Sequence, residues 1–296
     1  MTAPIFTKDI RLDGRIVLMT GGGGVLGGAM ADALLQAGAS VLLADVEGAA
    51  AESAARDLAA KYDGRVAAVT CDITKEADCD RAVSQAVEIF GGLHVLVNNA
   101  GKGPAHMERA PKTKSFKFWE ADPDAWREII DINVCGTYLM ARAAAPHLIE
   151  QKWGRIVNVT TSMNTMIRGG NMPYGQSKAS LEAASAAWAD DFVDTGVTCN
   201  VLVPGGAADT PMVPKESPYA RENLVRPDVM IAPACWLASN DSDGVNSMRF
   251  LGRNWDPDGA DDDNIKAAGA PAAWPALAAE AGMGQPATTH GKDIPR

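Results

Sequence analysis

The chain has 296 residues, 47% of them hydrophobic, enough for one large α/β domain with a full core. A formal net charge of −10 argues against non-specific binding to nucleic acid or to an anionic membrane and favours small-molecule chemistry. The five cysteines form no CxxC pair, and no run approaches the ~20 apolar residues of a membrane span, so we expect a cytoplasmic protein without a metal site.

A glycine-rich turn follows the first apolar run. Residues 15–20 read RIVLMT and lead into GGGGVLGG, after which apolar residues recur at helical spacing as far as Gly38. Gly22, Gly24 and Gly27 fit the pattern GxGxxG between a strand and a helix, where backbone amides can approach a pyrophosphate closely. The alternative is a tight turn that binds nothing.

Asp45 ends the second apolar run, SVLLAD. A carboxylate about 20 residues after the glycines can accept a hydrogen bond from a ribose 2′-hydroxyl and would repel a 2′-phosphate. NAD is therefore favoured over NADP as cofactor. A solvated turn aspartate is the alternative.

Helices and strands continue to alternate, which predicts a Rossmann-like, doubly wound parallel sheet. Asp72 ends the third strand, either beside an adenine edge or as a helix cap. The sequence NNAG at 98–101 closes the fourth strand, where small residues leave room for a cofactor, although the same residues also suit a turn.

A long loop at 102–124 precedes a helix that we expect to start at Asp122-Pro123 and to run to about residue 151. The apolar positions of this helix exceed one sheet-facing stripe, which indicates a second buried face against another subunit. Asn133 lies inside the helix. Its amide could hold a water for a proton relay or could bond its own backbone.

Tyr174 and Lys178 follow the fifth strand, GRIVNVT, and lie four positions apart on one helix face. A phenol titrates near ~10, and a neighbouring ammonium favours the phenolate. The pair could then exchange a proton with an alcohol or carbonyl during hydride transfer to or from a nicotinamide, with the hydroxyl of Ser162 or Thr161 holding the substrate oxygen. A solvated helix face is the alternative.

The sixth strand ends at Pro204-Gly205 and leads into a lid-like segment, 206–228, in which Thr210 is placed to bond a carboxamide. One more helix and one more strand follow. After Gly252 no regular period survives, so residues 253–296 are expected to form an extended tail, with Trp255 and Trp274 as anchors. We also hypothesise that this tail closes the substrate pocket.

Residues 10–252 together resemble the short-chain dehydrogenase/reductase family, because several of its motifs occur here in the same order. The matching residues are Thr20-Gly21 with Gly27, NNAG at 98–101, Asn133, Tyr174 with Lys178, and Pro204-Gly205.

This resemblance implies roles for four side chains. Tyr174 would be the general acid/base, and Lys178 would bind the nicotinamide ribose and lower the pKa of the tyrosine. Ser162 would orient the substrate oxygen, and Asn133 would support the proton relay. The resemblance also implies a homotetramer or homodimer built through the two long helices.

Three features depart from the family pattern. Val25 stands where the turn usually has its middle glycine, so we expect Gly24 to supply the permissive backbone. The usual serine position, 13 residues before the tyrosine, is Thr161, but the SMN context favours Ser162. The chain also continues well past Gly252.

The sequence thus predicts a single-domain NAD-dependent oxidoreductase (1–252) with a C-terminal extension (253–296), acting on a secondary alcohol or ketone. An NAD(H)-binding regulatory protein without turnover, and an isomerase or dehydratase that uses NAD transiently, are the alternatives. Loops 102–124 and 205–228 would set the substrate. The residues expected to contact the cofactor are Gly21, Gly24, Val25, Leu26, Asp45, Asp72, Ile73, Asn99, Ala100, Gly101, Tyr174, Lys178, Pro204, Gly205 and Thr210.

Overall fold

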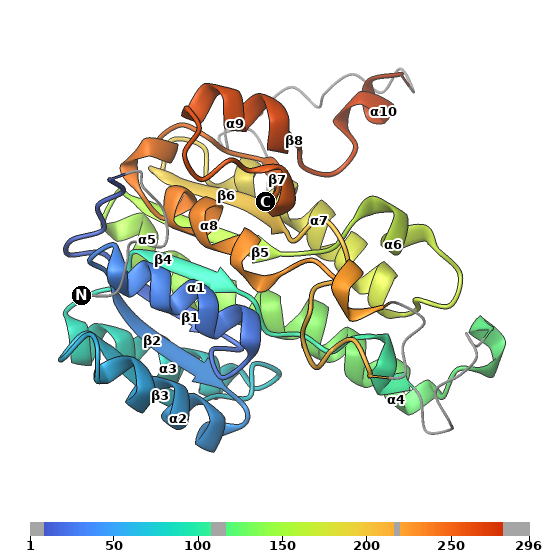
Figure 1. Cartoon of the computed structure of the whole chain (residues 1–296), viewed down its shortest axis with the longest axis horizontal. Coiled ribbons are helices and arrows are strands. Elements are labelled where there is room, and N and C mark those ends of the chain that lie inside the picture. The colour runs from blue at the N-terminus through green and yellow to red at the C-terminus, as the bar shows by residue number, and fades with distance from the viewer. Residues whose placement is uncertain (1–8, 108–116, 216–219, 281–296) are drawn as a thin grey trace, which may run out of the picture.

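The computed structural model describes residues 9–107, 117–215 and 220–280 and is built on one eight-stranded sheet (Figure 1). The strand order is β3-β2-β1-β4-β5-β6-β7-β8, and every neighbouring pair is parallel except β7 and β8. The strands are β1 (Ile16–Thr20), β2 (Ser40–Asp45), β3 (Val66–Thr70), β4 (Val95–Asn98), β5 (Gly154–Val159), β6 (Val197–Val203), β7 (Met248–Leu251) and β8 (Gly269–Pro271). The predicted doubly wound sheet is confirmed.

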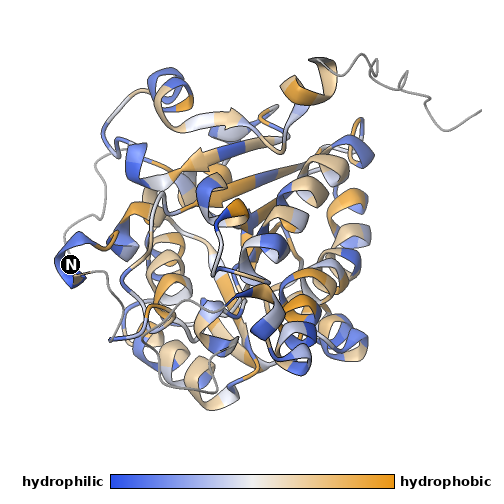
Figure 2. Cartoon of the chain, turned by 90° about the vertical axis from the view of Figure 1, so that its right-hand side faces the viewer, coloured by the Kyte–Doolittle hydropathy of each residue, from blue (hydrophilic) through white to orange (hydrophobic). Residues whose placement is uncertain are grey.

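Helices cover both faces of this sheet, which explains why its central strands are continuous apolar runs. Helices α1, α2 and α8 pack in one hydrophobic cluster, and α3, α5 and α7 pack in a second. Figure 2 shows hydrophobic colour along the central strands and hydrophilic colour on outer turns of the helices. The helices are α1 (Val25–Gln36), α2 (Gly48–Ala59), α3 (Glu76–Phe90), α4 (Pro123–Ile130), α5 (Thr137–Glu150), α6 (Met163–Ile167), α7 (Tyr174–Asp191), α8 (Ile231–Leu237), α9 (Asp261–Ala268) and α10 (Pro275–Glu280).

The strand order reverses between β1 and β4, because β2 lies on one side of β1 and β4 on the other. The loops that leave two such strands turn to opposite faces of the sheet, and a crevice opens at their carboxyl ends.

Among the described residues, no helix is both long and apolar enough to cross a membrane.

The helix expected from residue 123 is present, but it changes form partway along. The Asp122 carboxylate accepts hydrogen bonds from the amides of Asp124 and Ala125, and Pro123 takes the first helical position. A π-helical segment, Asp131–Gly136, then joins α4 to α5 and contains Asn133. Such widened turns are frequent at functional sites.

The tail expected after Gly252 is not extended, so that expectation is wrong for residues up to 280. Helix α9 leads into β8, which pairs antiparallel with β7. Trp255 is 9% exposed and packs against Trp236 and Phe250, with ring centroids 5.0 and 5.9 Å away. An eight-residue helix and a three-residue strand are too short to produce a readable period. Residues 281–296 lie outside the described part.

Because Trp255 is buried in an aromatic cluster, we expect Trp255→Ala to lower the free energy of unfolding by about 3–5 kcal/mol. Trp274 is 42% exposed and serves as the control. Trp274→Ala should cost less than about 1 kcal/mol. Urea unfolding followed by circular dichroism measures both, and equal losses would contradict the role of Trp255 as an anchor.

Candidate active site

The glycine turn after β1 is pressed against the end of β4. Gly21 has φ +65°, and a Cβ atom there would lie 2.9 Å from the Cα of Ala100. A Cβ on Gly27 would overlap the carbonyl oxygen of Gly21. Gly24, in contrast, has φ −83°, which any residue can adopt. The expectation that Gly24 supplies the permissive backbone is therefore wrong, because Gly21 does so.

The end of β4 locks this turn through hydrogen bonds. The hydroxyl of Thr20 accepts from the backbone amides of Asn99 and Ala100, both at 3.1 Å. The side-chain amide of Asn99 in turn donates to the carbonyls of Thr20 and Gly21, each at 3.1 Å. The NNAG segment therefore holds the glycine turn in place and is more than an ordinary turn.

A cleft of about 670 Å³ opens where the turn, the strand ends and the segment around Thr210 meet. Most of the residues predicted for the cofactor line it. They are Gly21, Gly24, Val25, Leu26, Asp45, Asp72, Ile73, Asn99, Ala100, Gly101 and Thr210.

Pro204 and Gly205 are not part of this lining. They pack on Arg253, whose guanidinium donates to the carbonyl of Gly205 at 3.2 Å. Sequence reasoning missed other lining residues that carry no motif: Cys71, Lys102, Gly103, Ala105, His106, Ile132, Pro211 and Met212.

Two carboxylates at the strand ends are held by local hydrogen bonds. Asp45 accepts from the amides of Gly23 and Glu47, each at 3.0 Å, so its side chain is fixed beside the glycine turn. Asp72 accepts from the amide and the hydroxyl of Thr74, and these bonds lower the pKa of Asp72. Lys75, not Asp72, is the N-cap of α3, so the helix-cap interpretation of Asp72 is wrong.

Lys178 lies behind the wall of the cleft. It is 4% exposed, and its ammonium donates to the carbonyl of Val159 at 2.9 Å. Burial lowers the pKa of Lys178 to about 8. A Cβ atom on Gly101, which lines the cleft, would lie 3.4 Å from the lysine Nζ, so this ammonium lies close to the cleft wall.

Tyr174 is the first residue of α7, the helix that also carries Lys178. Burial raises the pKa of the Tyr174 phenol, and a hydrogen bond with the Thr161 hydroxyl lowers it. This differs from the expectation that Lys178 lowers the tyrosine pKa, because the Lys178 ammonium is bonded to Val159. Neither Tyr174 nor Lys178 is among the residues that line the cleft.

The hydroxyl beside the phenol belongs to Thr161, whereas Ser162 is the N-cap of α6. The Ser162 oxygen accepts from the amide of Thr165 at 3.3 Å and bonds the Thr165 hydroxyl at 2.8 Å. This arrangement favours Thr161 over the expected Ser162 as the hydroxyl beside the phenol. The spacing of 13 residues before the tyrosine was the signal that identified Thr161.

Asn133 ties the loop after β4 to helix α7. Its oxygen accepts from the amide of Lys102 at 2.8 Å, and its nitrogen donates to the Lys102 carbonyl at 3.0 Å and to the hydroxyl of Ser177 at 2.9 Å. The Ser177 hydroxyl donates to the carbonyl of Tyr174 at 2.8 Å. The interpretation in which Asn133 bonds its own backbone is therefore wrong. Its amide connects the cleft wall to the start of α7.

The two loops expected to set the substrate meet at the cleft. A Cβ on Gly103 would overlap the side chain of Met212, so the lid segment rests directly on the loop after β4. His106 lines the cleft and bonds Glu128 at 2.6 Å. Residues 108–116 and 216–219 of these loops lie outside the described residues. Within the described chain, no group of three or more His, Cys, Asp or Glu side chains could hold a metal ion.

Among the described residues, none after Gly252 lines this cleft, so the structure gives no support to closure of the pocket by the C-terminal segment. The lining ends at Met212 in chain order, and residues 253–280 instead extend the far edge of the sheet.

Residues 15–220 match a family model described as short chain dehydrogenase. The chain is 32% identical over 209 residues to a 2,5-dichloro-2,5-cyclohexadiene-1,4-diol dehydrogenase of Sphingobium indicum, covering 70% of this chain and 78% of the relative. A 3-ketoacyl-(acyl-carrier-protein) reductase from Brucella melitensis, solved with NADH, is 28% identical with a TM-score of 0.68, over 79% of this chain and 94% of that one. A gluconate 5-dehydrogenase from Burkholderia cenocepacia, solved with NADP and tartrate, is 25% identical with a TM-score of 0.71, over 80% and 93%.

Two adjacent glycines of α1 allow a matched test of the turn. Gly27→Ala places a methyl group on the carbonyl of Gly21, whereas a Cβ on Gly28 meets nothing within 4 Å. We expect Gly27→Ala to weaken dinucleotide binding at least about tenfold, because the turn must open. Gly28→Ala should keep the affinity and add about 0.5–1 kcal/mol of stability from helix propensity. Calorimetric titration with NADH measures the affinities, and equal affinities would contradict the tight turn.

Proposed function

The chain belongs to the short-chain dehydrogenase family, and from this premise we propose that it is an NAD-dependent oxidoreductase that interconverts a secondary alcohol and a ketone. The observation that carries the proposal is that Lys178 lies behind Gly101 at the cleft wall and shares helix α7 with Tyr174, whose phenol bonds the Thr161 hydroxyl. A phenol, a second hydroxyl and a buried ammonium there suit the proton transfer that accompanies each hydride.

A nicotinamide bound in the cleft would supply or accept the hydride. In the oxidative direction, the phenolate of Tyr174 would take the proton from the alcohol oxygen while the hydride leaves the carbon that bears this oxygen, and in reduction the phenol would return a proton to the carbonyl oxygen. The hydroxyl of Thr161 holds the substrate oxygen and the phenol together. Lys178, whose pKa burial lowers to about 8, donates to the carbonyl of Val159 and would bind the nicotinamide ribose.

The choice of NAD is supported by acidic residues beside the glycine turn. Asp45 is fixed at the end of β2 by two backbone amides, and Glu47 lines the same part of the cleft. Two carboxylates would repel a 2′-phosphate and could accept from a 2′-hydroxyl. One of the similar solved structures holds NADH and another holds NADP, so the preference of this chain for NAD rests on these two carboxylates.

The test is nicotinamide absorbance with the purified chain, NAD or NADP, and a panel of cyclic and acyclic secondary alcohols. We expect Tyr174→Phe to lower turnover by about 10²–10⁴-fold, since it removes the proton carrier. Thr161→Ala should lower kcat by at least about tenfold. Wild type should prefer NAD, and Asp45→Asn should narrow that preference.

Ser162→Ala is the matched control for Thr161→Ala. Because Ser162 caps α6, its loss should cost about 1 kcal/mol of stability and leave kcat nearly unchanged. A larger kcat loss in Ser162→Ala than in Thr161→Ala would return the substrate-holding role to Ser162. NADH binding without turnover of any alcohol, or full activity in Tyr174→Phe, would count against the proposed enzyme.

We also propose that the chain acts on small molecules in the cytoplasm as a homodimer or homotetramer. Helix α5 leaves Tyr138 51% and Ile149 41% exposed, which suits burial against another copy. Sedimentation velocity at micromolar concentration should show a dimer or tetramer, and Tyr138→Glu should shift it toward monomer. A wild-type monomer would refute this arrangement.

A further inference from the structure

A buried pair of charges lies beneath Thr161. Glu182 of α7 is fully buried, and Arg249 of β7 is 6% exposed. The Nε of Arg249 donates to one oxygen of Glu182 at 2.8 Å, and the hydroxyl of Thr160 donates to the other at 2.8 Å. A second guanidinium nitrogen, Nη2 of Arg249, donates to the backbone carbonyl of Thr161 at 3.2 Å. Both charged groups therefore converge on the two residues that follow β5.

Stability alone is a poor explanation for such a pair. Burying two charges costs several kcal/mol of desolvation, and well-packed apolar residues in their place are often equally or more stabilising. The position of the pair instead relates it to the residues of the proposed reaction. Glu182 follows Tyr174 and Lys178 at four-residue intervals along α7, so the three side chains occupy one helical face.

Resting on the proposed function, we propose that Glu182 and Arg249 form a positioning pair that holds the Thr160 hydroxyl and the Thr161 carbonyl so that the Thr161 hydroxyl faces the phenol of Tyr174. Glu182 orients the guanidinium and anchors Thr160 from one side. Arg249 then fixes the Thr161 carbonyl from the other. With the Thr160 hydroxyl and the Thr161 carbonyl both held, the Thr161 hydroxyl is kept pointing toward the phenol.

The C-terminal extension contributes to this pair through β8. Arg249 pairs in register with Ala270, so β8 covers the edge of β7 and shields the main chain of Arg249 from water. Excluding water strengthens charged hydrogen bonds. Residues beyond the family match at 15–220 thus reach the catalytic centre indirectly, through the sheet.

Arg249→Lys tests the proposal, because a lysine ammonium can still pair with Glu182 but lacks the fork of donors that reaches the Thr161 carbonyl as well. The first readout needs no substrate. Tyrosinate absorbance, titrated against Tyr174→Phe as the reference, reports Tyr174 among the four tyrosines of the chain. We expect the pKa of Tyr174 to rise in Arg249→Lys, because the hydrogen bond from Thr161 that lowers it is weakened.

The second readout is turnover of whichever alcohol in the panel is oxidised. Arg249→Lys should lower kcat about tenfold, the size of one lost hydrogen bond to a charged group, with the Michaelis constant for NAD changed less than about twofold.

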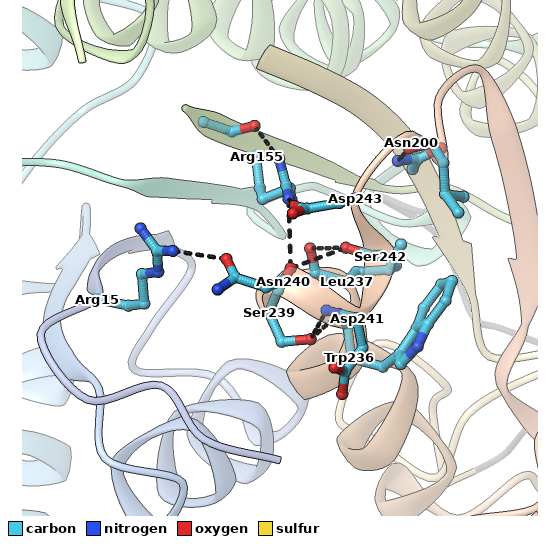
Figure 3. A network of polar contacts seen from close by, with 12 residues as sticks. Arg15, Arg155, Asn200, Trp236, Leu237, Ser239, Asn240, Asp241, Ser242 and Asp243 are labelled. Atoms are coloured by element: carbon cyan, nitrogen blue, oxygen red, sulfur yellow. Dashed lines mark hydrogen bonds and ion pairs between the residues drawn. The ribbon is translucent and has the colours of Figure 1, made fainter. Parts of the chain in front are cut away.

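Arg155→Lys is the matched control. Arg155 is 2% exposed and lies near the start of β5, at the other end of the strand from Thr160. It forms an ion pair with Asp243 and donates to the carbonyls of Gly154 and Ser239 (Figure 3). Its replacement should lower stability as any loss of a buried guanidinium does, without moving the tyrosine titration or kcat.

An unchanged Tyr174 titration and kcat in Arg249→Lys, or equal changes in Arg155→Lys, would overturn the positioning pair. If Arg249→Lys fails to fold, the double variant Glu182→Met/Arg249→Met replaces both charges with apolar side chains of similar volume and should show the same rise in the tyrosine pKa. Full activity in Tyr174→Phe would sink the proposed function instead. The titration of Tyr174 needs no turnover, so it tests the positioning pair whether or not the proposed function holds.

Discussion

The close contact between the glycine turn and the end of β4 is the constraint on which the cleft depends. Thr20 accepts the amides of Asn99 and Ala100, and Gly21 touches Ala100 so closely that a side chain could not fit. Since β1 and β4 flank the reversal of strand order, this contact lies at the floor of the crevice. This contact positions the N-terminus of α1 at Val25 and the cleft wall at Gly101.

The second layer of the site is a helix face rather than a loop. Tyr174, Lys178 and Glu182 emerge from α7 on one side, and Asn133 and Ser177 fasten the start of that helix to the loop after β4. Desolvation acts in opposite directions on the two titrating groups, raising the pKa of the phenol and lowering that of the lysine. A hydrogen bond with Thr161 partly offsets the effect of burial on the phenol, and the Lys178 ammonium donates to the carbonyl of Val159.

The extension past Gly252 changes how the sheet ends. Parallel sheets leave an edge strand with unpaired backbone groups, and β8 covers most of the short strand β7. Pro271 at the edge has no amide hydrogen to offer a further strand. The aromatic cluster of Trp236, Phe250 and Trp255 fastens this segment to the core. The extension is therefore an integral part of the fold.

Local periods and short spacings in the sequence predicted the sheet, the glycine turn, about half of the cleft lining and the shared helix face of Tyr174 and Lys178. The tertiary structure decided which hydroxyl meets the phenol, because Ser162 caps α6 while Thr161 bonds Tyr174. It also decided the partners of Asn133 and the joining of Glu182 to Arg249 across 67 residues. Contacts between distant segments leave no period in the chain, and a three-residue strand such as β8 forms only because β7 is already there to pair with it.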